Sequence, residues 1–487
     1  NLQRGNQWAC GITGEVFLRS RPKGAYISDV FIQTSVRRKE LKLIVELVGV
    51  AQQGEANFIA RLLNEKGKEE RQFRAQAKLR PARKQVVTLA WEWNNPRLWD
   101  FRQPNLYTLH LRVLGAGVDD EYWQTFGFRE FWIDGKRFFL NGKEIRLRPA
   151  LLPDEWTIYS GAVEYIDGVL DGLMKVGFNA GEQWPWDNYE RGRIDFRHLW
   201  AERADRKGFL IIGALPSMQP FLFETGWRLS WDEKRKVVWE ERVLRELKRL
   251  RNHPSIVMWT TTANLFGMPQ DQNPLLIGRR GLRNDKVAQA GREALEIVKR
   301  HDPTRPIFTH HGADVGDLHS VNMYLNLIPL QEREEWLSDW VRNGDLPFMC
   351  IEFGTPFHAT FLRGRDGFVK AIHTESLATE FCAIYLGTDA YLLETPLYRK
   401  RLVDSFRGGQ QYSSWHGARE LMELPSFQLI QALFIRNTWR SWRTWGITGG
   451  MVPWEMETQL WRRNRAISDQ TLKTVWVEGK RGAHFDE

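Results

Sequence analysis

The sequence PFMCIEFG, residues 347–354, joins a short apolar run to a single carboxylate, Glu352, with a glycine two residues later. An apolar run of this length that ends near a glycine is typical of a buried parallel strand. In β/α barrels, catalytic groups lie at the C-terminal ends of such strands. A lone Glu352 could also be a structural ion-pair partner, so the rest of the chain has to decide between the two interpretations.

From about residue 138 the chain alternates between apolar runs and amphipathic segments, which predicts a parallel sheet with helical connections. The strands are expected at residues 144–148, 176–180, 209–213, 255–259, 306–309, 320–324, 347–354 and 446–452. The helices are expected at residues 162–175, 198–207, 233–251, 285–300, 375–386 and 426–443. Eight such strands predict a (β/α)8 TIM barrel, and we assign residues 136–487 to this barrel with a C-terminal extension.

Residues 23–135 show the period-2 alternation of strands instead. The pattern is clearest at residues 26–33 and 41–47, and further strands are expected near residues 58–63, 85–91 and 107–113. Roughly seven short strands in about 110 residues predict an immunoglobulin-like β-sandwich. Residues 1–22 hold one plausible strand, which is too short to be a domain and is interpreted as the end of a larger one.

The bulk composition is that of an ordinary soluble globular protein, with 42% hydrophobic and 26% charged residues. The net charge of +9 comes from Lys and Arg interspersed with Asp and Glu, which favours a solvated surface over a nucleic-acid interface. The sequence contains no run of about 18 apolar residues, so no membrane span is expected. The chain begins at Asn1 without a signal-peptide pattern, so its N-terminus looks truncated, and secretion or a periplasmic location both stay open.

The three cysteines are too few for a disulfide framework, and no CxxC pair suggests zinc. Cys350 is expected to be a small buried hydrophobe. The 23 tryptophans are unusual, and several stand in predicted loops beside Pro, Asp or Asn. Core packing accounts for most tryptophans in any protein, but at the rim of a pocket their flat faces and N–H donors suit sugar rings.

Motifs in a fixed order extend over roughly residues 95–355. They are WD at 99–100, PNLY at 104–107, FGFR at 126–129, FLNGK at 139–143, RNHPSIVMW at 251–259, SVNMY at 320–324 and the stretch at 347–354. This set resembles glycoside hydrolase family 2, the β-galactosidase-like enzymes, whose members carry a jelly-roll domain, an immunoglobulin-like sandwich and a (β/α)8 barrel. The resemblance implies that residues 1–22 are the last strand of an otherwise missing jelly-roll sugar-binding domain. It also implies that Glu352 is a nucleophile.

The sequence departs from the family after the fourth barrel strand. The family has Trp-x-x-x-Asn-Glu there, and its Glu is the general acid/base. In this chain Ala263 takes the Asn position and Asn264 takes the Glu position. An amide cannot give a proton to a leaving oxygen, so the acid is either displaced or absent.

Retaining glycosidases need two carboxyl groups about 5–5.5 Å apart. With Glu352 as the nucleophile, Tyr324 would hydrogen-bond and orient it, unless Tyr324 is a packed core residue. The displaced acid could be Asp271, in the loop after strand four, or Glu182, after strand two. Asp271 could instead cap a turn, and Glu182 could instead form a rim ion pair or accept from a substrate hydroxyl.

The remaining candidates are substrate-binding residues. Asn264 would bond the sugar 2-hydroxyl, and one of His310 and His311 would point toward a hydroxyl while the other packs outside. Trp184 and Trp454 would stack on a sugar or pack the rim of the barrel. Glu455 is a weaker candidate for the acid. Arg148 and Asn179 would form a polar wall of the pocket. We expect no metal and no cofactor, since the adjacent histidines lack a third ligand with clear spacing.

The leading hypothesis is a retaining exo-β-glycosidase with a displaced or unusual acid/base, which acts on an oligosaccharide or polysaccharide-derived β-glycoside. One alternative is a catalytically silent family member that binds glycans. Another is an enzyme that needs no strong acid because its substrate has a good leaving group. Glu352 and Tyr324 favour an active glycosidase, whereas Asn264 favours a glycan-binding protein without catalytic activity. The sugar, the linkage and the oligomeric state stay open.

Overall fold

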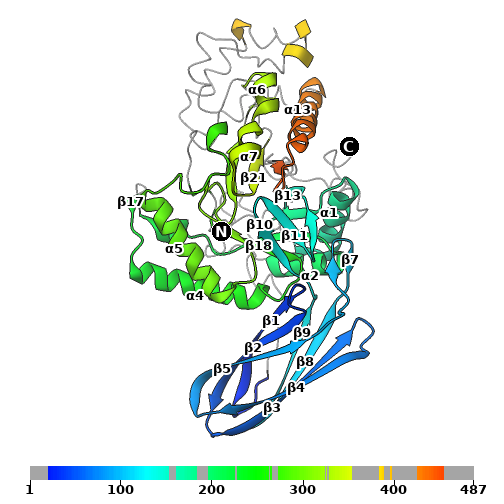
Figure 1. Ribbon diagram of the computed structural model, residues 1–487, viewed down its shortest axis with the longest axis vertical. Coiled ribbons are helices and arrows are strands. Elements are labelled where there is room, and N and C mark those ends of the chain that lie inside the picture. The colour runs from blue at the N-terminus through cyan, green and yellow to red at the C-terminus, as the bar shows by residue number, and fades with distance from the viewer. Residues whose placement is uncertain are drawn as a thin grey trace, which may run out of the picture.

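The computed structural model shows an all-β unit followed by a barrel of parallel strands and helices (Figure 1). It describes residues 20–152, 161–183, 196–224, 228–262, 264–265, 273–323, 325, 328–353, 383–385, 387–388, 395–397 and 425–453. The predicted fold class, an immunoglobulin-like sandwich before a (β/α)8 barrel, is confirmed. In this part of the chain, none of the helices is both long and apolar enough to cross a membrane.

The sandwich consists of two antiparallel sheets, with strand orders β1-β2-β5 and β4-β3-β8-β9. The strands are β1 Tyr26–Ser35, β2 Glu40–Val50, β3 Gly54–Asn64, β4 Glu69–Leu79, β5 Ala82–Glu92, β8 Tyr107–Gly115 and β9 Val118–Phe126. Along β2, Leu41, Leu43, Val45 and Leu47 are fully buried while the residues between them are partly exposed. This alternation is what the period-2 pattern predicts for a strand that covers a core on one face.

A small antiparallel sheet covers the N-terminal end of the barrel. Its order is β10-β11-β12, and a separate short pair, β6-β7, precedes it. The bounds are β6 Trp99–Asp100, β7 Gln103–Pro104, β10 Phe131–Asp134, β11 Arg137–Leu140 and β12 Lys143–Ile145. Phe131, Phe138 and Leu140 share one buried cluster with Ile212 and Met258 from the barrel strands. The barrel interior is therefore packed with side chains at this end, and the opposite end holds the polar groups described below.

The barrel strands form two parallel sheets, with orders β13-β14-β15-β18-β19 and β20-β21-β22. The strands are β13 Pro149–Leu151, β14 Ala180–Glu182, β15 Leu210–Ala214, β18 Ile256–Thr260, β19 Ile307–Phe308, β20 His319–Met323, β21 Phe348–Phe353 and β22 Met451–Pro453. The first and last strands meet where Leu147 N donates to Thr448 O at 2.8 Å. At the other junction between the two sheets, Asp317 N, just before β20, donates to Ile307 O of β19 at 2.9 Å.

Amphipathic helices cover the outside of the barrel (Figure 1). They are α1 Val163–Lys175, α2 Arg197–Lys207, α4 Glu233–Leu250, α5 Lys286–His301, α6 Leu330–Glu335, α7 Ser338–Asn343 and α13 Pro425–Thr444. Shorter elements are α3 Gln219–Leu222, β16 Phe223–Glu224, β17 Arg228–Leu229 and η4 Pro274–Leu276. Asp232 and Asp285 cap α4 and α5 by accepting from backbone N–H groups of the first turn, which explains why both helices begin where they do.

Three predicted barrel strands were placed too early in the sequence. Residues 143–145 pair antiparallel with β11, so the first barrel strand begins only at Pro149. Val176 N and Phe178 N donate to carbonyls of α1, so this segment ends the helix instead of forming strand two. Gly446 and Gly450 have positive φ, Gly446 lies in a turn, and the last strand begins only at Met451.

The RNHP motif at 251–254 attaches the sandwich to the barrel. Arg251 forms a buried ion pair with Asp29 of β1. Asn252 accepts from Ile32 N at 3.0 Å and donates to Val30 O at 2.8 Å, both on the same strand. The motif therefore satisfies the backbone of a sandwich strand from the base of the barrel.

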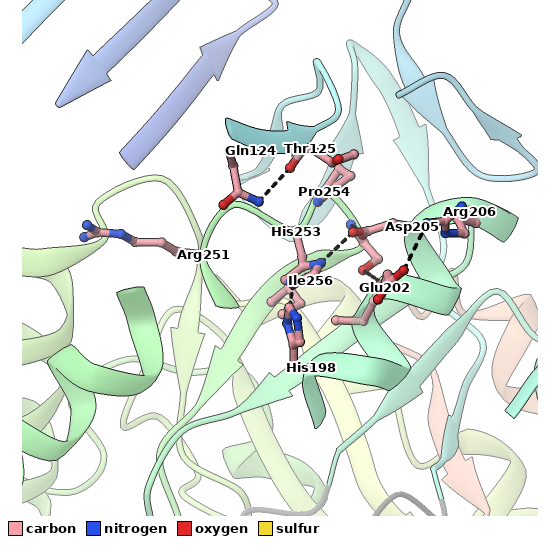
Figure 2. A network of polar contacts seen from close by, with 12 residues as sticks. Gln124, Thr125, His198, Glu202, Asp205, Arg206, Arg251, His253, Pro254 and Ile256 are labelled. Atoms are coloured by element: carbon pink, nitrogen blue, oxygen red, sulfur yellow. Dashed lines mark hydrogen bonds and ion pairs between the residues drawn. The ribbon is translucent and has the colours of Figure 1, made fainter. Parts of the chain in front are cut away.

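His253 of the same motif lies between Asp205 and His198 of α2 (Figure 2). Its Nδ1 is 2.6 Å from Asp205 Oδ2, and its Nε2 is 2.9 Å from His198 Nδ1. Burial, together with the nearby His253, lowers the pKa of His198 to about 4. This network holds α2 against the segment that leads into β18, so the motif has a structural role.

Candidate active site

Three ionisable side chains meet at the C-terminal ends of the barrel strands. Glu352 is the penultimate residue of β21, Glu182 is the last residue of β14, and His310 follows β19 by two residues. Their exposed fractions are 3%, 0% and 0%. The prediction that Glu352 ends a buried barrel strand is confirmed.

The imidazole of His310 lies between the two carboxylates. Its Nδ1 is 3.0 Å from Glu182 Oε1, and its Nε2 is 3.4 Å from Glu352 Oε1. Burial alone would lower the pKa of His310, but the charges and hydrogen bonds of Glu182 and Glu352 outweigh it and raise this pKa to about 9. In its imidazolium form the ring can donate to both carboxylates.

Asn264 and Asn322 form a second polar pair at the same end of the barrel. Asn322 Nδ2 donates to Asn264 Oδ1 at 3.0 Å. In the sheet register, Asn322 of β20 is the partner of Glu352 on β21, so this pair adjoins the carboxylate cluster. Asn264 has a φ of 47°, a left-handed conformation that asparagine tolerates better than most residues.

Several buried polar atoms here have hydrogen-bonding capacity that the described residues do not use. They are Glu182 Oε2, Gln183 Oε1, Thr260 Oγ1, Thr261 Oγ1 and Asn322 Oδ1. All belong to residues in or directly after the last positions of β14, β18 and β20. Buried polar groups normally have partners, and a ligand with several hydroxyls can supply them. The chemistry of this end of the barrel thus suits a polyhydroxylated molecule.

Arg148 and Asn179 lie at the other end of the barrel strands, which corrects their prediction as pocket-wall residues. Arg148 directly precedes β13, and its Nε donates to Gly177 O at 2.5 Å. Asn179 directly precedes β14 and bonds Arg148 N at 2.7 Å and Arg146 O at 3.0 Å. They tie the starts of two strands together, and the reason for the error is the misplacement of those strands.

Five predicted site residues fall outside the described part of the chain. They are Tyr324, Asp271, Trp184, Trp454 and Glu455. Cys350 is buried as expected, and burial raises the pKa of its thiol. Among the described residues, no group of three or more His, Cys, Asp or Glu side chains is arranged to hold a metal ion.

Two features of the site were missed from the sequence. One is Asn322, whose signal was a polar residue inside the otherwise apolar core of strand 320–324. The other is that His310 contacts carboxylates on both sides, whereas we expected one of the two histidines to point toward a sugar hydroxyl. No local pattern predicts this contact, because Glu182 and His310 are 128 residues apart in the sequence.

A sandwich that precedes a (β/α)8 barrel, with acidic and amide groups at the C-terminal ends of its strands, is an arrangement in which a barrel glycosidase can hold its carboxyl groups. A model of glycosyl hydrolases family 2 matches residues 25–129, and the model of that family's TIM barrel domain matches residues 198–364. Together the two models match more than half of the chain. The chain belongs to glycoside hydrolase family 2.

Relatives in this family include a β-glucuronidase from Paenibacillus borealis, 24% identical over 390 residues, which cover 75% of this chain and 59% of the relative. A β-galactosidase from Bacteroides ovatus is 25% identical over 347 residues, which cover 63% of this chain and 38% of the relative. This chain therefore spans less than two thirds of the length of either relative.

Solved structures show the same fold. A β-glucuronidase from Ruminococcus gnavus, in complex with C6-substituted uronic isofagomine, has a TM-score of 0.54 at 17% identity. The match covers 88% of this chain and 61% of that one. A family 2 member from Bacteroides cellulosilyticus has a TM-score of 0.50 at 20% identity, covering 67% of this chain and 40% of that one.

Proposed function

We propose that this chain is a retaining exo-β-glycosidase in which Glu352 is the nucleophile. The observation that carries the proposal is the position of Glu352, buried at the C-terminal end of β21 among polar groups of β14, β18 and β20. Membership of a glycosidase family supports hydrolysis of an O-glycosidic bond.

In the proposed reaction a Glu352 oxygen attacks the anomeric carbon as the bond to the leaving oxygen breaks. The leaving oxygen takes a proton from a general acid, and a water then hydrolyses the glycosyl-enzyme ester. The two carboxyl groups of such an enzyme face one another across the sugar. Glu182 does not meet this condition, since an imidazole lies between it and Glu352. Asp271 is the acid that we propose.

The substrate that we propose is a β-linked sugar at the end of an oligosaccharide or of a polysaccharide-derived chain. Relatives named β-glucuronidase and β-galactosidase indicate two sugars to test, a β-glucuronide and a β-galactoside. The β-galactoside follows from the family resemblance of the sequence.

A catalytically silent glycan-binding protein is the second candidate. The observation that favours it is the hydrogen bond of 3.0 Å from Asn322 to Asn264, the amide that the sequence resemblance puts where the family has its general acid/base. The same polar groups could bind a sugar without turning it over. The two candidates differ in whether Glu352 forms a covalent bond to the sugar.

The test is a panel of activated aryl β-glycosides, including the galactoside and the glucuronide, followed by labelling with mechanism-based 2-deoxy-2-fluoro sugars. We expect turnover of at least one substrate and one sugar adduct on Glu352 by mass spectrometry. Glu352→Gln should abolish both, with a loss of about 10³-fold or more in kcat. Sugar binding in calorimetry without turnover or adduct would instead establish the silent candidate.

A further inference from the structure

His310 connects two buried carboxylates through the two nitrogens of one ring. The contacts are 3.0 Å to Glu182 Oε1 and 3.4 Å to Glu352 Oε1, and neither carboxylate is more than 3% exposed. A neutral imidazole carries one N–H and can donate to only one of these partners. Only the imidazolium satisfies both, so the charge on His310 decides whether both carboxylates or only one of them has a hydrogen-bond donor from this ring.

The main chain of His310 is held by backbone hydrogen bonds. His310 N donates to Thr262 O at 3.0 Å, and Leu265 N donates to His310 O at 3.1 Å, so the segment after β18 holds the residue on both sides of its peptide. The charged groups among the described residues that hydrogen-bond the ring are Glu182 from β14 and Glu352 from β21.

We propose that Glu182 and His310 are positioning residues for Glu352: Glu182 keeps His310 in its imidazolium form, and the imidazolium orients Glu352 and keeps it ionised. This inference rests on the proposed function and extends it. His310 keeps its proton throughout, and the proton for the leaving oxygen comes from the general acid. Glu182 thereby acts on the reaction only through His310.

The arrangement predicts an alkaline limit to activity. His310 loses its proton as the pH rises through about 9, and one of the two carboxylates then loses its N–H donor. The alkaline limb of kcat/KM should therefore lie near pH 9 in the wild-type chain. Glu182→Gln removes the charge that favours the imidazolium, so this limb should move to lower pH by at least one unit.

The kinetic test compares Glu182→Gln and Glu182→Asp with the matched control Glu240→Gln. Glu240 also pairs with a histidine, at 2.7 Å from His301 Nε2, but it joins α4 to α5 outside the barrel. We expect Glu182→Gln to lower kcat about 10²-fold with KM nearly unchanged, Glu182→Asp to recover part of this loss, and Glu240→Gln to have no effect. An unchanged pH profile in Glu182→Gln would overturn the proposal.

A measurement without turnover separates this inference from the proposed function. In chains with ¹⁵N-labelled histidine, the His310 signals, assigned through His310→Gln, should show an imidazolium up to about pH 9. In Glu182→Gln they should show a neutral ring at lower pH. Titration of His310 near pH 6.5 in the wild type would overturn the proposal even if Glu352 is labelled. The expected titration without any labelling of Glu352 would overturn the proposed function and leave an ion pair with no catalytic role.

Discussion

At the scale of single residues, the sequence predicts some features of the site, and others are visible only in the structure. Glu352, His310 and Asn264 are examples. The sequence was sufficient to place Glu352 at the end of a buried strand, because an apolar run before one carboxylate is a local pattern. The resemblance to the family also predicts that Asn264, an amide, stands where the family has an acid, and this stays a prediction. The contact between His310 and Glu182 was not predictable, because it depends on the register of strands far apart in sequence.

The substitution Asn264→Glu tests whether the site lacks only its acid. Because Asp271 is the proposed acid, we expect Asn264→Glu to leave kcat/KM on glycosides with poor leaving groups no higher than in the wild type. The matched control is Asn264→Gln, which has the same length and shares the strain of a φ of 47° but cannot donate a proton as an acid. A rise in kcat/KM in Asn264→Glu but not in Asn264→Gln would contradict the expectation and mean that the site lacks only its acid.

At the scale of elements, most helices and the central strands were predicted to within a residue or two. The predicted helix 233–251 is α4, Glu233–Leu250, and the predicted strand 255–259 is β18, Ile256–Thr260. The errors lie at the first, second and last barrel strands, which have only three residues each. Strands this short have too few residues for a pattern, and the contacts that define them come from neighbouring strands.

Gly450 allows the last strand to meet the first. It has a φ of +75°, and a Cβ there would lie 2.3 Å from Leu147 O and 2.7 Å from Pro149 Cδ. Gly450→Ala should therefore lower the free energy of unfolding by about 3 kcal/mol, from strain and overpacking together.

Gly446→Ala is the control for this substitution. Gly446 has a φ of +70°, but its nearest neighbour is the flexible end of Arg146 at 4.0 Å. This variant should lose only about 1 kcal/mol, which is the strain alone. Urea unfolding followed by tryptophan fluorescence gives both values, and equal losses would mean that the contact with Leu147 is unimportant.

For the whole molecule, the order of sandwich and barrel was predictable because the change from period-2 to helical periodicity is visible near residue 138. The attachment between the two units was not. It depends on Arg251 and Asn252 reaching β1 across more than 200 residues of sequence. These hydrogen bonds join residues that are far apart in the sequence, so no local sequence pattern predicts them.

Asn252→Ala should weaken the coupling between sandwich and barrel. It leaves Ile32 N–H and Val30 C=O buried without their partner, at a cost of about 3 kcal/mol. In calorimetry we expect one transition in the wild type and two in Asn252→Ala. Asn57→Ala, which removes an exposed hydrogen bond to Gln76 within the sandwich, is the control and should leave the transition intact. An unchanged profile in Asn252→Ala would show that other contacts couple the units.

The meeting of β13 and β22 has a consequence for synthesis in the cell. The two strands are separated by about 300 residues, so at translation rates of about 5–20 residues per second the first strand waits about 15–60 s for its neighbour. If β13-β14-β15-β18-β19 forms during that time, it is an open sheet whose β13 edge can pair with another chain. We therefore expect that slower initiation or lower temperature during expression raises the yield of folded protein, because one strand of the barrel is made late.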